Sequence, residues 1–206
     1  MSVEAVDTVL LAGGLSQRFG RPKAGAVWRG STLAARVLAA RPACPGRTVL
    51  VLRAEGDPQP VAADVVTWDD PADPPGPLRG VIAGLRACNA EWALVTACDL
   101  PGLTPAVLTL LRAEARPGDA AVVPEWDGRE QPLCALYAVS AAEGLAAALA
   151  DGERSLAGAL KRLSVRRLPQ ERIRSVDPAG TSFVNVNRPE DLALLEQKAD
   201  RQENDP

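Results

Sequence analysis

Histidine is absent from the 206 residues of this chain. Its absence excludes the Ser-His-Asp and Cys-His nucleophilic systems, and it excludes zinc sites that need an imidazole ligand. Any catalysis must therefore use carboxylates, lysine, arginine, hydroxyls, backbone amides or a metal ion held by oxygen ligands. The chemistry of the chain is narrowed, but an enzyme is not excluded.

Cysteine is scarce, and the four cysteines are Cys44, Cys88, Cys98 and Cys134. No two of them form a C-x-x-C pair, and a chain of this length does not depend on a disulfide scaffold. We expect four reduced, mostly buried thiols and a cytoplasmic protein, because free cysteine behaves as a small apolar residue.

A basic excess is also lacking, because 23 basic residues face 26 acidic ones and the net charge is −3. Binding to a nucleic-acid backbone needs a dense basic surface, so no nucleic-acid partner is expected, although a local basic pocket for a small anion is. Met1–Thr8 has no basic region typical of a signal peptide. No uncharged apolar run is long enough to span a bilayer, so no membrane partner is expected.

What the sequence does contain is enough apolar material for a core, with 47% hydrophobic and 24% charged residues. We expect a single domain over residues 1–197, with an N-terminal half to about residue 124 and a C-terminal part from about 125. The polar residues 198–206 are expected to form a frayed tail.

Short apolar runs alternate with helical patterns along the N-terminal half. Buried strands are predicted at residues 6–12, 48–52, 64–67, 92–97 and 119–124. Helices are predicted from residue 31 to before Pro42, at 78–88, and at 104–115, the last capped by Thr104. This alternation is typical of a three-layer, Rossmann-like α/β fold with a doubly wound, mostly parallel sheet.

The C-terminal part is less regular. Residues 131–139 predict one strand, which we interpret as antiparallel. Further predictions are helices at 140–150 and 155–163, a short strand at 183–186 and a final helix at 189–198.

The segment L-A-G-G-L-S-Q-R-F-G-R-P-K follows the first strand. Gly13 and Gly14 allow a sharp turn that leaves backbone amides open to a phosphate, and Arg18 and Lys23 add two cations. The segment is neither a Walker A loop nor G-x-G-x-x-G. A plain strand-to-helix turn with surface cations is the alternative, but the two cations at these spacings favour triphosphate binding.

Asp99 stands in A-C-D-L-P, directly after the fourth predicted strand. A carboxylate at the carboxyl end of a parallel strand is well placed to hold Mg²⁺ against a triphosphate. The alternative is that Asp99 caps a turn before Pro101.

Two further segments carry polar side chains. In W-D-D-P-A-D-P-P-G-P-L-R-G, Asp69 or Asp70 would lie near a base or ribose, or else the segment is a solvated loop. In F-V-N-V-N-R-P-E-D, strand alternation places the amides of Asn185 and Asn187 on one face, where they would meet a polar ligand or a metal. The alternative for Asn187 is that it caps the final helix.

These motifs, in this order, resemble molybdenum cofactor guanylyltransferases. The pattern is L-A-G-G-x-S-x-R-x-G-x-x-K, P-G-P-L-x-G, C-D-x-P, a Q-P-L strand and F-x-N-x-N-x-P-E-D-L, from about Val6 to Leu195. The first motif marks only the wide nucleotidyltransferase superfamily, and the P-G-P-L-R-G loop and the last motif narrow it. An asparagine that some members carry after the second strand falls near Leu52 here.

The resemblance implies transfer of GMP from GTP to the phosphate of molybdopterin, with release of pyrophosphate. It implies that Leu11, Ala12, Gly13 and Lys23 bind GTP, that Asp69 contacts the nucleotide, and that Asp99 is the Mg²⁺ ligand. We add Gly14 to the nucleotide site and Arg18 to the catalytic residues, and we expect Gln131 and Pro132 to join Asn185 and Asn187 on the molybdopterin side.

The absence of histidine agrees with this chemistry, because an attacking phosphate is already anionic and needs no general base. Positioning and charge neutralisation by Mg²⁺, lysine and arginine are enough. The alternatives are a molybdopterin cytidylyltransferase, a sugar-phosphate nucleotidyltransferase or a non-catalytic nucleotide-binding protein. Transient contacts with other molybdenum cofactor biosynthesis proteins or molybdoenzymes would also be expected.

Overall fold

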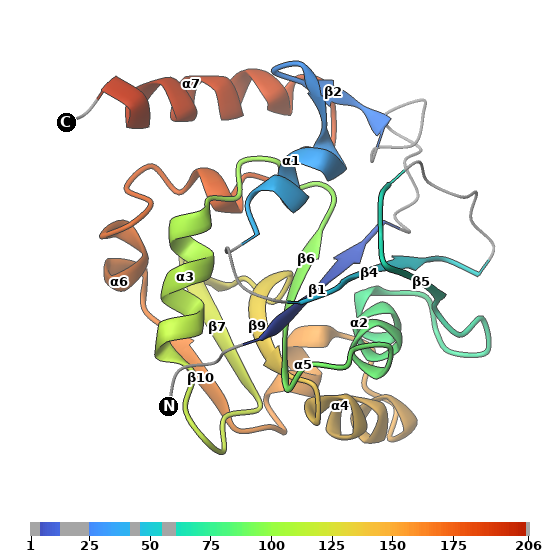
Figure 1. Ribbon diagram of the computed structural model, residues 1–206. Helices are drawn as coiled ribbons and strands as arrows, with labels where there is room; N and C mark the ends of the chain where they lie inside the picture. Colours follow the sequence, from blue (N-terminus) through green and yellow to red (C-terminus); the bar gives the residue numbers. More distant parts are fainter. Residues whose placement is uncertain (1–4, 13–24, 42–45, 55–60, 205–206) are drawn as a thin grey trace.

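The computed structural model describes residues 5–12, 25–41, 46–54 and 61–204 (Figure 1). Its centre is an eight-stranded sheet in the order β10-β7-β9-β6-β1-β4-β5, with β8 paired to β7 at one end. The strands are β1 (Val6–Leu11), β4 (Thr48–Leu52), β5 (Val65–Trp68), β6 (Trp92–Ala97), β7 (Ala121–Trp126), β8 (Arg129–Glu130), β9 (Cys134–Ala138) and β10 (Val165–Leu168).

The sheet is mostly parallel, as the sequence predicts. β1 pairs in parallel with both β4 and β6, and β5 continues the parallel run beyond β4. β9 runs antiparallel to β6 and β7, which confirms the antiparallel strand predicted in this region. The short β8 is also antiparallel, in a hairpin with β7 that the sequence did not reveal.

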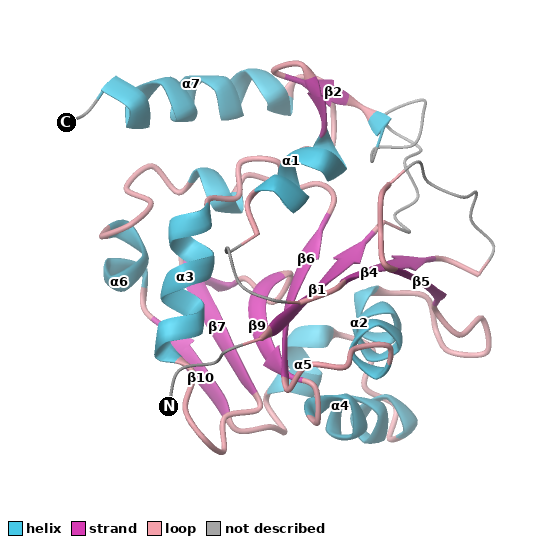
Figure 2. Ribbon diagram, in the orientation of Figure 1, coloured by secondary structure: helices cyan, strands magenta, loops and turns pink. Residues whose placement is uncertain are grey.

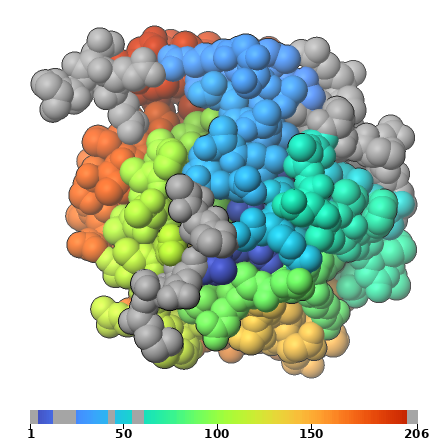
Figure 3. All heavy atoms as spheres, in the orientation of Figure 1, coloured from blue at the N-terminus to red at the C-terminus, as the bar shows by residue number. Residues whose placement is uncertain are grey.

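Helices cover both faces of the sheet and make three layers (Figure 2). One face packs against α2 (Pro77–Arg86), α4 (Ala141–Ala150) and α5 (Leu156–Leu160). The other face packs against α1 (Leu33–Ala39) and α3 (Pro105–Glu114), whose side chains hide most of the strands in Figure 3. The layers confirm the predicted doubly wound α/β fold.

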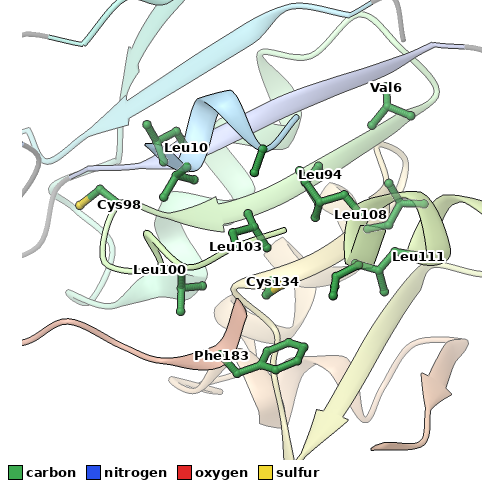
Figure 4. Close-up of a cluster of buried hydrophobic side chains, with 14 of the residues drawn as sticks. Val6, Leu10, Leu94, Cys98, Leu100, Leu103, Leu108, Leu111, Cys134 and Phe183 are labelled. Atoms are coloured by element: carbon green, nitrogen blue, oxygen red, sulfur yellow. The ribbon is translucent and has the colours of Figure 1, made fainter. Parts of the chain in front are cut away.

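A continuous apolar cluster joins the sheet to α3. Leu10 and Leu94 from neighbouring strands meet Leu108 and Leu111 of the helix, and Phe183 closes the cluster at one side (Figure 4). Each of these aliphatic side chains is almost fully buried, so each contributes roughly 1.5–3 kcal/mol to folding.

The helix starts follow the local sequence. Thr104 accepts a hydrogen bond from the Val107 amide and Pro105 is the first helical residue, as predicted. Thr32 caps α1 in the same way through the Ala35 amide. Residues 31–32 belong to β3 (Ser31–Thr32), which pairs with β2 (Val27–Trp28), so this hairpin occupies the predicted start of the first helix.

The C-terminal region departs most from the predictions. β10 and α6 (Gln170–Arg174) were not foreseen. The predicted strand at 183–186 is wrong: a 3-10 helix, η2 (Thr181–Phe183), is followed by irregular backbone. α7 spans Asp191–Asn204, so residues expected to form a frayed tail continue a helix, which lies beside β2 in Figure 1.

The three cysteines that the structure describes are free thiols, and Cys98 and Cys134 are buried. Burial raises the pKa of the Cys88 thiol to about 12, so it stays protonated at neutral pH. These three fit the expected inert thiols, whereas Cys44 lies outside the described residues. Among the helices of the described regions, none has the length and apolar character needed to cross a membrane.

Candidate functional site

The carboxyl ends of three neighbouring strands converge at one edge of the sheet. The backbone amide of Cys98, just after β6, donates to the carbonyl of Leu11 at 3.1 Å. The amide of Ala12 donates to the carbonyl of Val51 in β4 at 3.0 Å. Ligands of open α/β sheets bind outside this edge. Leu11 and Ala12, two of the predicted nucleotide-binding residues, therefore stand where such a ligand would lie.

The glycine-rich loop continues from Ala12, but Gly13, Gly14, Arg18 and Lys23 lie outside the described residues. Their binding of a triphosphate stays a prediction. The described chain resumes at Gly25, and the β2–β3 hairpin follows at once.

Asp99 is half-buried and follows β6 at the same edge. Its backbone carbonyl accepts a hydrogen bond from the amide of Val186 at 2.8 Å. This bond brings the segment that contains Asn185 and Asn187 from the far end of the sequence to the end of β6. The backbone segments that carry the predicted catalytic carboxylate and the predicted acceptor-binding asparagines are therefore neighbours in space.

Asn185 and Asn187 are exposed, whereas Val184 and Val186 are buried. The predicted alternation is thus present, although the segment is not a strand. Val184 and Val186 pack with Trp28 of the hairpin and Leu195 of α7, and this packing turns both asparagines outward.

The support for this segment comes from Asp177, which the sequence analysis did not single out. Its carboxylate is fully buried and accepts hydrogen bonds from the amides of Thr181 at 3.0 Å and Ser182 at 2.9 Å. Next to it, Phe183 stacks on Trp126 with ring centroids 5.3 Å apart. An aspartate shortly before a Gly-Thr-Ser turn was the available signal, since such side chains commonly bond to amides a few residues on.

The start of α7 bears on the alternative role of Asn187. The helix begins at Asp191, two residues later than predicted, and the Asp191 carboxylate accepts from the backbone amides of Asn187 at 2.6 Å and Arg188 at 2.8 Å. A carboxylate in the first turn also suits the positive end of the helix dipole. The backbone of Asn187 is thereby tied to the helix start.

Asp69 does not present its carboxylate to solvent. It is 6% exposed, forms an ion pair with Arg79 at 2.7 Å through Oδ2, and accepts from the Ala54 amide at 3.0 Å through Oδ1. Its neighbour Asp70 is exposed and accepts from the Ala72 amide at 2.9 Å within a turn. The structure thus places Asp69 at the expected edge but encloses it in protein donors.

Gln131 and Pro132 lie beyond β6 at the same edge, because Cys134 pairs with Thr96 near the end of that strand. The Gln131 side chain donates to the carbonyls of Trp126 and Arg129, each at 3.4 Å. The Tyr137 hydroxyl donates to the Pro132 carbonyl at 2.9 Å. The sheet therefore fixes this turn on the side of the edge away from β4 and β5.

The described residues contain no cluster of three or more metal-ligating side chains. The half-buried Asp99 is the predicted metal ligand at this edge. Mg²⁺ is commonly held by one or two carboxylates together with substrate phosphates and water, so this donor set fits a metal that arrives with a nucleotide.

An open α/β sheet with polar residues at the carboxyl edge of its parallel strands belongs to the class of proteins that bind a ligand at this edge. Within it, residues 8–167 match the MobA-like NTP transferase domain, and the chain belongs to this family of nucleotidyltransferases. Such enzymes typically use a divalent metal.

The similarity to individual proteins spans nearly the full length of the chain. It is 31% identical to a probable molybdenum cofactor guanylyltransferase of Bacillus cereus, over 92% of this chain and 94% of that one. The crystal structure of a molybdopterin-guanine dinucleotide biosynthesis protein A from Archaeoglobus fulgidus superimposes with a TM-score of 0.76 at 30% sequence identity. The superposition covers 95% of this chain and all of that chain. A cytidylyltransferase from Thermus thermophilus, that of 2-C-methyl-D-erythritol 4-phosphate, shares the fold at 21% identity and a TM-score of 0.66, with 95% and 99% covered.

Proposed function

We propose that the protein transfers GMP from GTP to the phosphate of molybdopterin, with release of pyrophosphate. The proposal is supported by the guanylyltransferase relatives and carried by one observation, the hydrogen bond from Val186 to Asp99. That bond, to the Asp99 backbone carbonyl, brings the segment of Asn185 and Asn187 to the residue whose carboxylate we expect to hold the metal. Two substrates that must react with each other would meet at that point.

On the nucleotide side, Leu11, Ala12, Gly13 and Gly14 would bind GTP through backbone groups, and Arg18 and Lys23 would neutralise the triphosphate. Asp99 would hold Mg²⁺, which when bound withdraws charge from the phosphate oxygens. The molybdopterin phosphate then attacks the α-phosphorus of GTP, and the bond to the β-phosphate oxygen breaks. The chain itself supplies alignment and positive charge.

On the acceptor side, Asn185, Asn187 and the Gln131–Pro132 turn would line the place for molybdopterin. A side-chain amide offers both donors and an acceptor, which suits the mixed polar edge of a pterin. Transient contact with other proteins of molybdenum cofactor biosynthesis, or with molybdoenzymes, would deliver this substrate or receive the product. Three free thiols and a nucleotide substrate support a cytoplasmic location.

A panel of nucleoside triphosphates tests the proposal. The purified protein is incubated with Mg²⁺, a molybdopterin acceptor and GTP, CTP, ATP or UTP in turn, and pyrophosphate release is measured. We expect release with GTP well above the other three. Release with CTP alone would make the protein a cytidylyltransferase, and release with a sugar phosphate but not with molybdopterin would assign a different acceptor. Binding of GTP with no release for any acceptor would make it a non-catalytic nucleotide-binding protein.

A further inference from the structure

The carboxyl edge of the sheet contains a buried ion pair. Arg79 Nε donates to Asp69 Oδ2 at 2.7 Å, and the two side chains are 2% and 7% exposed. Removing one partner of such a pair leaves an uncompensated buried charge, which costs far more than losing an ion pair at the surface. Loss of either partner alone should therefore destabilise this part of the fold.

The pair connects segments that are separate in the sequence. Asp69 accepts from the Ala54 amide after β4, and Arg79 Nη1 donates to the carbonyls of Asp70 at 3.2 Å and Asp73 at 2.8 Å. One guanidinium thus holds the loop of residues 69–76, which we call the β5–α2 loop, against the ends of two strands. Arginine is suited to this because its planar fork presents several donors at fixed angles.

The same residue lies in the first turn of α2, which abuts the end of β1. A Cβ added at Gly80 would lie 3.4 Å from the Leu11 side chain, so helix and strand approach closely here. Leu11 is the residue from which the predicted nucleotide-binding segment starts. A shift of Arg79 would therefore move the β5–α2 loop and the helix start relative to that segment.

We propose that Asp69 and Arg79 are positioning residues for the nucleotide. Through their pair, they hold the β5–α2 loop and the start of α2 against Leu11. The nucleotide contacts this loop and helix start, but not the Asp69 carboxylate. The inference rests on the proposed function for the identity of the nucleotide. It differs from the direct contact that the family resemblance implies, because the Asp69 side chain is only 7% exposed and each of its oxygens already accepts a hydrogen bond from the protein.

The test is a double-mutant cycle with Asp69→Asn, Arg79→Gln and the double variant. Binding of GTP in the presence of Mg²⁺ is measured by calorimetry, together with KM and kcat. We expect each single variant to raise Kd for GTP by about tenfold or more, with kcat at saturating GTP changed less than about threefold. The double variant, which buries no unpaired charge, should recover Kd to within about threefold of the parent protein.

A direct contact predicts a different pattern. If Asp69 bound the nucleotide, Asp69→Asn would lose the same affinity with or without Arg79, and the double variant would show no recovery. If the pair were only structural, the free energy of unfolding would fall while Kd and KM held. Either result overturns the proposal.

A matched control and a nucleotide-free measurement complete the test. Arg86→Gln, further along α2, removes an exposed ion pair with Glu143 and should leave Kd unchanged. Hydrogen–deuterium exchange of the Asp73 amide, which bonds to the Asp70 carbonyl, should accelerate in Arg79→Gln and slow again in the double variant. If exchange of the Asp73 amide is the same in all variants, the positioning role is overturned. If exchange changes as expected but the parent protein does not bind GTP, only the proposed function is refuted.

Discussion

At the amino edge of the sheet, Asp7 is closed off by the protein, whereas at the carboxyl edge Asp99 is half-buried beside the predicted substrate sites. Asp7 accepts hydrogen bonds from the backbone amides of Arg47 at 2.7 Å, Asn89 at 2.7 Å and Ala90 at 3.1 Å. These amides belong to the segments just before β4 and β6. One carboxylate thus ties together the starts of three adjacent strands.

The difference between the edges indicates that the amino edge stabilises the fold and the carboxyl edge is the place for substrates. Fixing the strand starts with a buried carboxylate fixes the register in which the same strands end, because the sheet is rigid between its edges. At the carboxyl edge, by contrast, our proposals give the aspartates roles toward substrates: Asp99 would hold the metal and Asp69 would position the nucleotide. Substitutions at the two edges should therefore affect different measurements.

The largest effect is expected at Asp99. Asp99→Asn removes the charge that would hold Mg²⁺ but keeps the size of the side chain, so turnover should fall by about 10²–10³-fold, or roughly 3–4 kcal/mol in the transition state. The free energy of unfolding should change little. Steady-state pyrophosphate release at saturating Mg²⁺, with a denaturant titration as the control, measures both. Near-normal turnover would remove Asp99 from the metal site.

Lys23 gives the next largest effect. It is one of three lysines in the chain and closes the glycine-rich segment. Lys23→Ala removes a cation that neutralises developing charge. The fall in kcat/KM for GTP should correspond to roughly 3 kcal/mol of lost transition-state stabilisation, as for the loss of a single donor to a transition state. Lys161→Ala, on the C-cap of α5, is the matched control and should leave kcat/KM unchanged. Equal values for both variants would make Lys23 an ordinary surface residue.

Asp7 should show the opposite pattern. Burial alone raises the pKa of the Asp7 carboxyl, but the three amide hydrogen bonds and the charge of Arg47 outweigh it and hold the pKa below its usual value. The ionised form therefore stabilises the fold above the unfolded-state pKa of about 4, and this contribution is lost as the pH falls through the lower folded-state value. Asp7→Asn should reduce the free energy of unfolding by about 2 kcal/mol at pH 7.

The control for Asp7→Asn is the affinity of the variant for GTP. Kd for GTP should stay close to that of the parent protein, because the substitution lies at the edge away from Leu11 and Asp99. Urea titrations from pH 7 to pH 3 should show the difference between variant and parent shrinking with acid. A difference that grows with acid would mean that the folded state raises this pKa instead.

The strands of the sheet and the side-chain contacts around the site differ in how far they can be predicted from the sequence. The strands 48–52 and 92–97 could be placed to the residue, because continuous, mostly apolar runs with charged residues close to both ends leave few other choices. The Asp69–Arg79 pair could not be predicted, because it depends on a contact between the end of one strand and the start of the next helix that only the fold brings about. The hydrogen bonds of Asp177 to Thr181 and Ser182 are local, so the sequence carried a signal for them that the predictions did not use. Residues 183–186 have the alternation of a strand, yet pairing with a neighbouring strand is what makes a strand, and here Val184 and Val186 pack on Trp28 and Leu195 instead.

The smallest effect is expected for the asparagines of that segment, and it decides what their exposure means. Both amides face outward while their backbone is fixed by Val186 and Asp191. If they contact molybdopterin, Asn185→Ala and Asn187→Ala should each weaken binding of the pterin substrate by about 1 kcal/mol, roughly fivefold, and leave Kd for GTP within about twofold. If Asn187 only supports the start of α7, its loss should lower the free energy of unfolding by about 1 kcal/mol and spare both substrates. Calorimetry with each substrate and a denaturant titration separate these outcomes. A fall in GTP affinity with pterin affinity intact would mean that the two sides of the site are assigned in reverse.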